Sequence, residues 1–148
     1  MTDVVDSETR SRMMSGIRGK NTKPELEIRR LLHQRGFRYR LHDKKLPGKP
    51  DIVLKKYNAV IFIHGCFWHR HNCHLFKWPK TRPEFWKQKI TRNHENDIAA
   101  LAELLSGGWR VCVVWECSIK GSSKNVPMVS ESIVRWLKSN NSMLEIPE

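Results

Sequence analysis

The apolar run AVIFI at residues 59–63 constrains the fold more than any other segment of this chain. A strand with one face in water alternates apolar and polar residues. This run is apolar at every position, so it predicts a central strand that is buried on both faces. Covering both faces of a sheet requires helices on either side of it. The chain has 148 residues, which is long enough for one compact domain with a core of its own.

The segments around residues 59–63 predict the remaining elements of one mixed sheet. β-Branched and aromatic residues between turn signals predict further strands at residues 37–42, 51–54 and 109–115. Apolar residues at helical spacing predict helices at residues 22–36, 81–105 and 129–137. The order α-β-β-β-α-β-α indicates an α/β fold, a single mixed β-sheet flanked by helices. We expect one domain over residues 1–148, with a basic N-terminal arm at 1–20 and a mobile tail at 140–148.

The charge of the chain indicates a polyanionic partner. It carries 27 Lys+Arg against 15 Asp+Glu, a formal net charge of +12, which is typical of proteins that bind nucleic acid. The arm at residues 1–20 is either a solvated tail or a contact to phosphates. We find no signal-peptide core and no run of about 18 apolar residues, so we expect no membrane partner and a cytoplasmic location. Four cysteines in a reduced compartment favour metal binding or free thiols over disulfides.

The run HGCFWHRHNC at residues 64–73 is dense in side chains that bind metals. Its spacing Cys66-x4-His71-x-Cys73 supplies three of the four tetrahedral ligands that zinc requires. The fourth ligand has local candidates and more distant ones: His69, His74, Cys112 and Cys117.

We select Cys117 as the fourth ligand. Cys112 lies inside an apolar strand, where a small buried core residue is the ordinary role of cysteine. Cys117 follows the end of that strand, where a thiolate can reach a loop. A site of Cys66, His71, Cys73 and Cys117 would be structural and closed to further ligands. Free cysteines beside exposed histidines are the alternative, against which the density of ligands argues.

The same run holds residues that a four-coordinate metal does not need. His64 and His69 are free for other work, and neutral imidazole is the usual proton acceptor near pH 7. Phe67 and Trp68 are flanked by polar ligands, so we interpret them as too exposed for ordinary core. Apolar side chains of this kind can wedge between base steps and kink a duplex. The remaining tryptophans that we assign to the core are Trp109, Trp115 and Trp136.

Carboxylates near strand ends are candidates for a second, catalytic metal site. Asp51 follows Pro50 and opens a strand, and the neighbouring strand ends at His64, so antiparallel pairing should bring Asp51 and His64 close together. Mg²⁺ binds one or two carboxylates together with water, and it neutralises charge on a phosphodiester. Glu25, in the first turn of a helix, is a second candidate carboxylate, although a capping role alone explains it equally well.

These residues together carry a resemblance to a known family. The pair Pro50-Asp51, the strand that ends Phe62-Ile63-His64 and the order of elements resemble the PD-(D/E)xK nuclease superfamily, with Phe-x-His in place of carboxylate-x-lysine. With HGCFWHRHNC, TRPEFW and VVWEC in this order, the chain is similar to the very-short-patch repair (Vsr) DNA mismatch endonuclease family. The resemblance covers residues 10–121 or so, and several rare motifs at compatible spacing make it specific.

The resemblance implies a DNA endonuclease that nicks one strand 5′ of the thymine in a T:G mismatch. Such mismatches arise when 5-methylcytosine deaminates, and the nick starts very short patch repair. It also implies a monomer associated with the bacterial nucleoid, with double-stranded DNA and other repair proteins as partners. Two alternatives remain: a non-catalytic zinc-containing module that binds nucleic acid through charge and stacking, and a zinc hydrolase with only three protein ligands.

Carried over by position, the resemblance implies that Asp51 and the backbone carbonyl of Ile63 bind a catalytic Mg²⁺. Position 63 is Ile where we expect relatives to carry Thr. A backbone ligand survives that change, but a role for a hydroxyl does not. His69 would be the general base for the attacking water, and His64 and Glu25 would hold water on the metal or orient the site.

The resemblance assigns the other motifs as well. It places structural Zn²⁺ on Cys66, His71, Cys73 and Cys117, in agreement with the choice made from spacing. It implies that a wedge inserts into DNA beside the mismatch, formed by Phe67, Trp68 and Trp86. Core packing explains Trp86 equally well from its helical position alone. Basic residues near Trp86 fit phosphate contacts or a solvated helix face: Lys87, Lys89 and Arg92.

Overall fold

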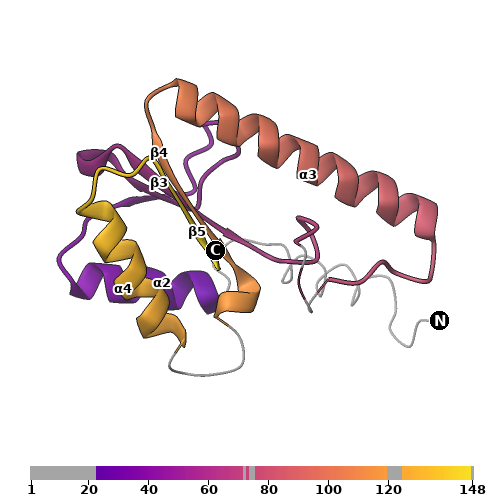
Figure 1. The fold of residues 1–148 in the computed structure, drawn as a ribbon, viewed down its shortest axis with the longest axis horizontal. Coiled ribbons are helices and arrows are strands. Elements are labelled where there is room, and N and C mark those ends of the chain that lie inside the picture. Colours follow the sequence, from indigo (N-terminus) through magenta and orange to yellow (C-terminus); the bar gives the residue numbers. More distant parts are fainter. Residues whose placement is uncertain (1–22, 72, 74–75, 120–124, 148) are drawn as a thin grey trace.

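A five-stranded mixed sheet runs through the computed structural model, which describes residues 23–71, 73, 76–119 and 125–147 (Figure 1). Its strands lie side by side in chain order: β1 (Arg40–Leu41), β2 (Ile52–Leu54), β3 (Ala59–His64), β4 (Arg110–Trp115) and β5 (Met143–Ile146). β1, β2 and β3 pair antiparallel, whereas β3, β4 and β5 pair parallel. The predicted α/β class with a single mixed sheet is confirmed.

Helices cover both faces of the sheet. α3 (Pro83–Ser106) links β3 to β4 on one face, while α2 (Lys23–Gln34) and α4 (Asn125–Leu137) lie together on the other (Figure 1). Two short 3₁₀ helices follow β2 and β4: η1 (Lys55–Tyr57) and η2 (Glu116–Ser118). The first half of α3 extends beyond the sheet, above the loop that follows β3 (Figure 1). Within the described part of the chain, no helix is both long and apolar enough to cross a membrane.

β3 is the central buried strand that its apolar run predicts. Val60 and Ile61 have no exposed surface. Successive side chains of a strand point to opposite faces. Accordingly, Ile61 packs in the core formed with α2 and α4, whereas Phe62 packs in the second core, under α3. By the same alternation His64, at the end of β3, lies on the α3 face, with its ring centroid 5.3 Å from that of Phe62.

The first predicted strand is shorter than expected. Of residues 37–42, only Arg40–Leu41 pair with β2. The Phe37 N–H instead donates to the Leu32 carbonyl at 3.0 Å, so the backbone of Phe37 caps the end of α2. Its ring still enters the core, with 5% of its surface exposed. Apolar alternation therefore marks the burial of Phe37 but not the strand pairing of the segment, and Leu41 is exposed.

The C-terminal segment forms part of the sheet, so the prediction of a mobile tail at residues 140–148 is wrong for Met143–Ile146. These residues form β5 and pair in parallel with β4. Leu144 and Ile146 pack against the core under α2 and α4, and this burial anchors the segment.

The basic arm expected at residues 1–20 lies outside the described residues. The three tryptophans assigned to the core do pack against it: Trp109, Trp115 and Trp136.

The loop between β1 and β2 is pressed against α3. Gly48 has a φ of +74°, and a Cβ at this position would lie 2.8 Å from the Ala100 Cβ and 3.1 Å from the Phe62 ring. Only glycine fits so close an approach. The Lys49 N–H donates to the Leu46 carbonyl at 3.1 Å and closes the turn. The loop is thereby held beside the end of β3.

Candidate functional site

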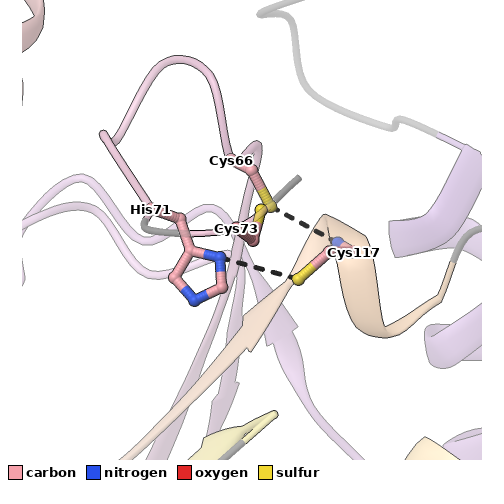
Figure 2. A group of neighbouring side chains, drawn as sticks. All are labelled: Cys66, His71, Cys73 and Cys117. Carbon is pink, nitrogen blue, oxygen red and sulfur yellow. Dashed lines mark hydrogen bonds between the residues drawn. The ribbon is translucent and has the colours of Figure 1, made fainter. Parts of the chain in front are cut away.

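Four side chains of metal-binding type converge at the end of β4 (Figure 2). Cys66, His71 and Cys73 come from the loop after β3, and Cys117 comes from η2. Their ligand atoms all lie within 4.8 Å of one another. His71 presents its Nδ1 to the Cys117 Sγ at 3.5 Å, and the Cys117 N–H faces the Cys66 Sγ at 3.4 Å. This cluster can hold one four-coordinate metal ion, which would tie the loop to the strand end.

Two thiols of this cluster, Cys66 and Cys117, would have to lose a proton to bind a metal. Burial raises the pKa of the Cys66 and Cys117 thiols, so at neutral pH both stay protonated until a metal displaces the protons. Cys112 is different, because it is fully buried among the apolar residues under α2 and α4. Its predicted role as a small core residue is confirmed.

His64 and His69 form a stacked pair on the α3 face. Their ring centroids are 3.9 Å apart, and their planes differ by 6°. The Nδ1 of His69 lies 2.5 Å from the Oδ2 of Asp97 on α3. Burial lowers the pKa of His64, and the neighbouring His69 lowers it further, so His64 is neutral at pH 7. With Nδ1 engaged by Asp97, the Nε2 of His69 can accept a proton.

Trp115 connects the histidine pair to the cysteine–histidine cluster. Its indole stacks on His71 with a centroid distance of 4.2 Å and meets the His64 ring edge-on at 5.2 Å. The indole Nε1–H donates to the Oε1 of Glu145 on β5 at 2.8 Å. The two groups therefore share one aromatic wall, which the C-terminal strand orients.

Glu25, His42 and Asp51 form a third group at the start of β2. Glu25 is 2% exposed; its Oε2 accepts a hydrogen bond from Arg29 at 3.0 Å and lies 2.9 Å from the Nε2 of His42. The Oδ2 of Asp51 accepts the N–H of Ile63 at 2.7 Å. The ligand atoms of the three residues lie within 4.8 Å of one another. Glu25 thus contacts a residue outside its own helix, His42.

The electrostatics of this third group favour a cation. Burial and the nearby Glu25 carboxylate together raise the pKa of Asp51 to about 7, against the lowering effect of the Ile63 N–H. Two carboxylates this close repel each other when both are ionised. A divalent cation with oxygen ligands would relieve that repulsion, so the donor set fits such an ion.

The antiparallel pairing of β2 and β3 brings Asp51 against Ile63, one residue before His64. His64 itself belongs to the separate group with His69 and Asp97. The helical members of the two groups come from opposite faces of the sheet, Glu25 from α2 and Asp97 from α3. The two groups therefore flank the end of β3.

Phe67, Trp68 and Trp86 form one aromatic cluster between the loop and the start of α3. Their ring centroids are 5.2 Å apart for Phe67 and Trp68, and 5.6 Å apart for each of the other two pairs. Trp68 is only 9% exposed, so the expectation that it is too exposed for core is wrong. The rings of Phe67 and Trp86, both half-buried, cover it.

A groove of about 290 Å³ lies beside His69 and Asp97. Lys44 and Lys49 line it from the loop between β1 and β2, and amide side chains line it from α3. Lysine and amide donors next to a proton acceptor suit an anionic substrate.

Asp97 and His42 belong to the site but were not predicted from the sequence. Asp97 does have a signal: it falls within the stripe Ile90, Leu101 and Leu104 at helical spacing, where a carboxylate interrupts apolar positions. His42 has no comparable signal, because it reaches Glu25 only through the pairing of β1 with β2.

A mixed sheet with a carboxylate at the start of β2 and imidazoles at the end of β3 is the arrangement expected of a nuclease of the PD-(D/E)xK superfamily. The family model "DNA mismatch endonuclease Vsr" matches residues 2–75. The DNA mismatch endonuclease Vsr of Escherichia coli (strain K12) is 42% identical over 147 residues, which are 99% of this chain and 94% of that protein. This chain belongs to the Vsr DNA mismatch endonuclease family.

Other relatives are nicking enzymes. The type II nicking enzyme V.NmeAIP of Neisseria meningitidis serogroup A is 50% identical over 123 residues, 83% of this chain and 88% of that enzyme. The type II nicking enzyme V.XorIIP of Xanthomonas oryzae pv. oryzae is 48% identical over 119 residues, 80% of this chain and 88% of that enzyme.

Proposed function

We propose that this protein is a DNA mismatch endonuclease that nicks one strand 5′ of the thymine in a T:G mismatch and so starts very short patch repair. The observation that carries the proposal is that two groups, a carboxylate group around Asp51 and the His69–Asp97 pair, flank the end of β3. The names of the relatives, a mismatch endonuclease and nicking enzymes, support it. We place the protein in the bacterial cytoplasm, at the nucleoid.

Asp51 and the backbone carbonyl of Ile63 would hold the catalytic Mg²⁺. A carbonyl ligand needs nothing from the side chain at position 63, so Ile is compatible with this role. When bound, the ion neutralises charge on the scissile phosphate. Glu25, held by Arg29 and His42, keeps its buried carboxylate in place beside Asp51.

His69 would be the general base. Its Nδ1–H donates to Asp97, which leaves Nε2 to take a proton from the attacking water. His64 is neutral and stacked against His69, so it holds that ring in place without adding a charge beside it. The groove lined by Lys44 and Lys49 would receive the phosphate backbone next to this base.

The cluster of Cys66, His71, Cys73 and Cys117 would bind structural Zn²⁺, because thiolate and imidazole in a tetrahedron are the ligands zinc prefers. It would hold the loop that carries His69, Phe67 and Trp68. Phe67, Trp68 and Trp86 would form the wedge beside the mismatch. Since Trp68 is buried, Phe67 and Trp86 would have to move aside before it enters the base stack.

Basic residues of α3 near Trp86 would contact phosphates. Lys87 and Arg92 are exposed, and Lys89 is half-buried on the same helix. We expect the protein to act as a monomer on double-stranded DNA and to meet other repair proteins there.

Replacing Asp51 tests whether the site is catalytic. Asp51→Ala should abolish nicking of a T:G duplex in Mg²⁺ but leave duplex binding largely intact, because the carboxylate serves the metal. Glu103→Ala is the matched control, since Glu103 is an exposed carboxylate near the far end of α3, and it should cut normally. A wild-type protein that binds duplex DNA without cutting it would support the non-catalytic zinc module instead.

A further inference from the structure

Two aromatic side chains in the described part of the chain are largely exposed, Trp78 at 46% and Phe85 at 44%. An exposed large ring loses its contact with water only when another molecule covers it. Trp78 lies in the loop before α3, and Phe85 lies in the first turn of α3. Neither ring belongs to the metal clusters, the histidine pair or the wedge of Phe67, Trp68 and Trp86.

Both rings border the cluster of Phe67, Trp68 and Trp86. Trp78 meets Phe76 edge-to-face at 5.0 Å, and Phe76 in turn contacts Phe67 at 6.3 Å. Phe85 meets Trp86 edge-to-face at 5.1 Å. Edge contacts of this kind fix the orientation of a ring. Trp78 and Phe85 therefore form an exposed rim on an aromatic cluster whose central ring, Trp68, is buried.

The charge around this rim is strongly positive. Residues 76–89 contain a single acid, Glu84, and five basic residues: Lys77, Lys80, Arg82, Lys87 and Lys89. The guanidinium of Arg82 lies 4.7 Å from the centroid of the Phe85 ring, a cation–π contact that holds it at the surface. Aromatic faces among cations suit a nucleic-acid strand, which offers bases to stack and phosphates to pair.

We propose that Trp78 stacks on a base that leaves the helical stack beside the mismatch, and that Arg82, held by Phe85, contacts a phosphate of the same strand. This inference rests on the proposed function, because a displaced base requires a duplex that the protein opens. The inner wedge would open the base step, and the outer ring would receive the base. Unstacking costs free energy, and a receiving aromatic face offsets that cost.

Fluorescence anisotropy with a labelled T:G duplex, without added Mg²⁺ and at several salt concentrations, separates the two contacts. Trp78→Leu should weaken binding by about 5- to 150-fold at every salt concentration, since stacking does not release counterions. Trp78→Phe should recover most of the affinity. Arg82→Gln should reduce the slope of log affinity against log salt by about one. Met128→Leu, at a 66% exposed position on α4, is the control and should change neither.

The base can be followed directly with 2-aminopurine placed next to the mismatch. Stacking on Trp78 should keep the 2-aminopurine fluorescence low in the wild-type complex. In the Trp78→Leu complex the fluorescence should be higher, because the displaced base has no ring to stack on. Unchanged affinity of Trp78→Leu for the T:G duplex would overturn the inference. An equal loss of affinity on a perfectly matched duplex would overturn it too, because no base is displaced there. Nicking in Mg²⁺ is measured separately, and its absence would contradict the proposed function. A loss of affinity in Trp78→Leu that is confined to the T:G duplex would still support the stacking contact.

Discussion

Asp51→Asn should stabilise the protein while it removes activity. Burial and the Glu25 carboxylate raise the pKa of Asp51 to about 7 from its ordinary 3.8. Ionised Asp51 is therefore unfavourable in the folded protein when no cation is bound. The Asn amide has nearly the same shape, and its oxygen can still accept the Ile63 N–H that Asp51 accepts at 2.7 Å. The substitution removes the charge and keeps the hydrogen bond.

The size of the effect follows from linkage between proton binding and folding. The difference between the pKa of about 7 for Asp51 in the folded protein and its ordinary pKa of 3.8 corresponds to about 4 kcal/mol of unfolding free energy, at about 1.36 kcal/mol per pKa unit. The folded pKa is the higher one, so the wild-type protein loses this stability as pH rises from about 4 to about 7. Above that range the loss is complete. Asp51→Asn should therefore match the wild type below pH 4 and exceed it by up to about 4 kcal/mol above pH 7.

Urea unfolding of zinc-loaded protein, without added Mg²⁺, measures this difference at each pH. Glu131→Gln is a useful control of opposite sign, because Arg35 lowers the pKa of the exposed Glu131. Adding Mg²⁺ should stabilise the wild type and leave Asp51→Asn unchanged, since only the wild type keeps the carboxylate. A stability difference that does not vary between pH 4 and 8 would refute the reasoning.

Three further substitutions test the other groups. Cys117→Ser should lose zinc and have a lower melting temperature, which metal analysis and calorimetry would measure. The control Cys112→Ala should keep its zinc. Retained zinc in Cys117→Ser would favour a three-ligand site instead. Asp97→Asn should reduce kcat about 100-fold or more with little change in DNA affinity, because His69 loses its orientation. Single-turnover kinetics would measure this loss, and a much smaller loss would contradict the role of Asp97. Lys44→Gln should lower the salt slope of duplex binding by about one, and an unchanged slope would remove the groove from the DNA path.

Much of the fold follows from short-range patterns. The apolar run at 59–63 predicted the buried centre of the sheet, and β3 is buried on both faces. Cys66, His71 and Cys73 meet because they are close in sequence, and Cys117 joins them because the parallel pairing of β3 with β4 puts both strand ends at one edge. These features depend on local periodicity and on strand ends, and both can be read along the chain.

The remaining features depend on tertiary contacts. β5 was missed because its residues look like a polar tail until parallel pairing with β4 places Leu144 and Ile146 on the core. Asp97 meets His69 across 28 positions, and His42 meets Glu25 across 17. Polar neighbours in the sequence suggested an exposed Trp68, but Phe67 and Trp86 bury it. Sequence neighbours say little about which partner covers a side chain.

The most direct test of the central claim is to map the nick on a duplex with a single T:G mismatch. Each strand would be end-labelled in turn and incubated with the zinc-loaded protein and Mg²⁺, with a matched duplex in parallel. We expect one cut, on the thymine strand immediately 5′ of the mismatched thymine, and no cut in the matched duplex. Equal cutting of both duplexes, or of both strands, would contradict it.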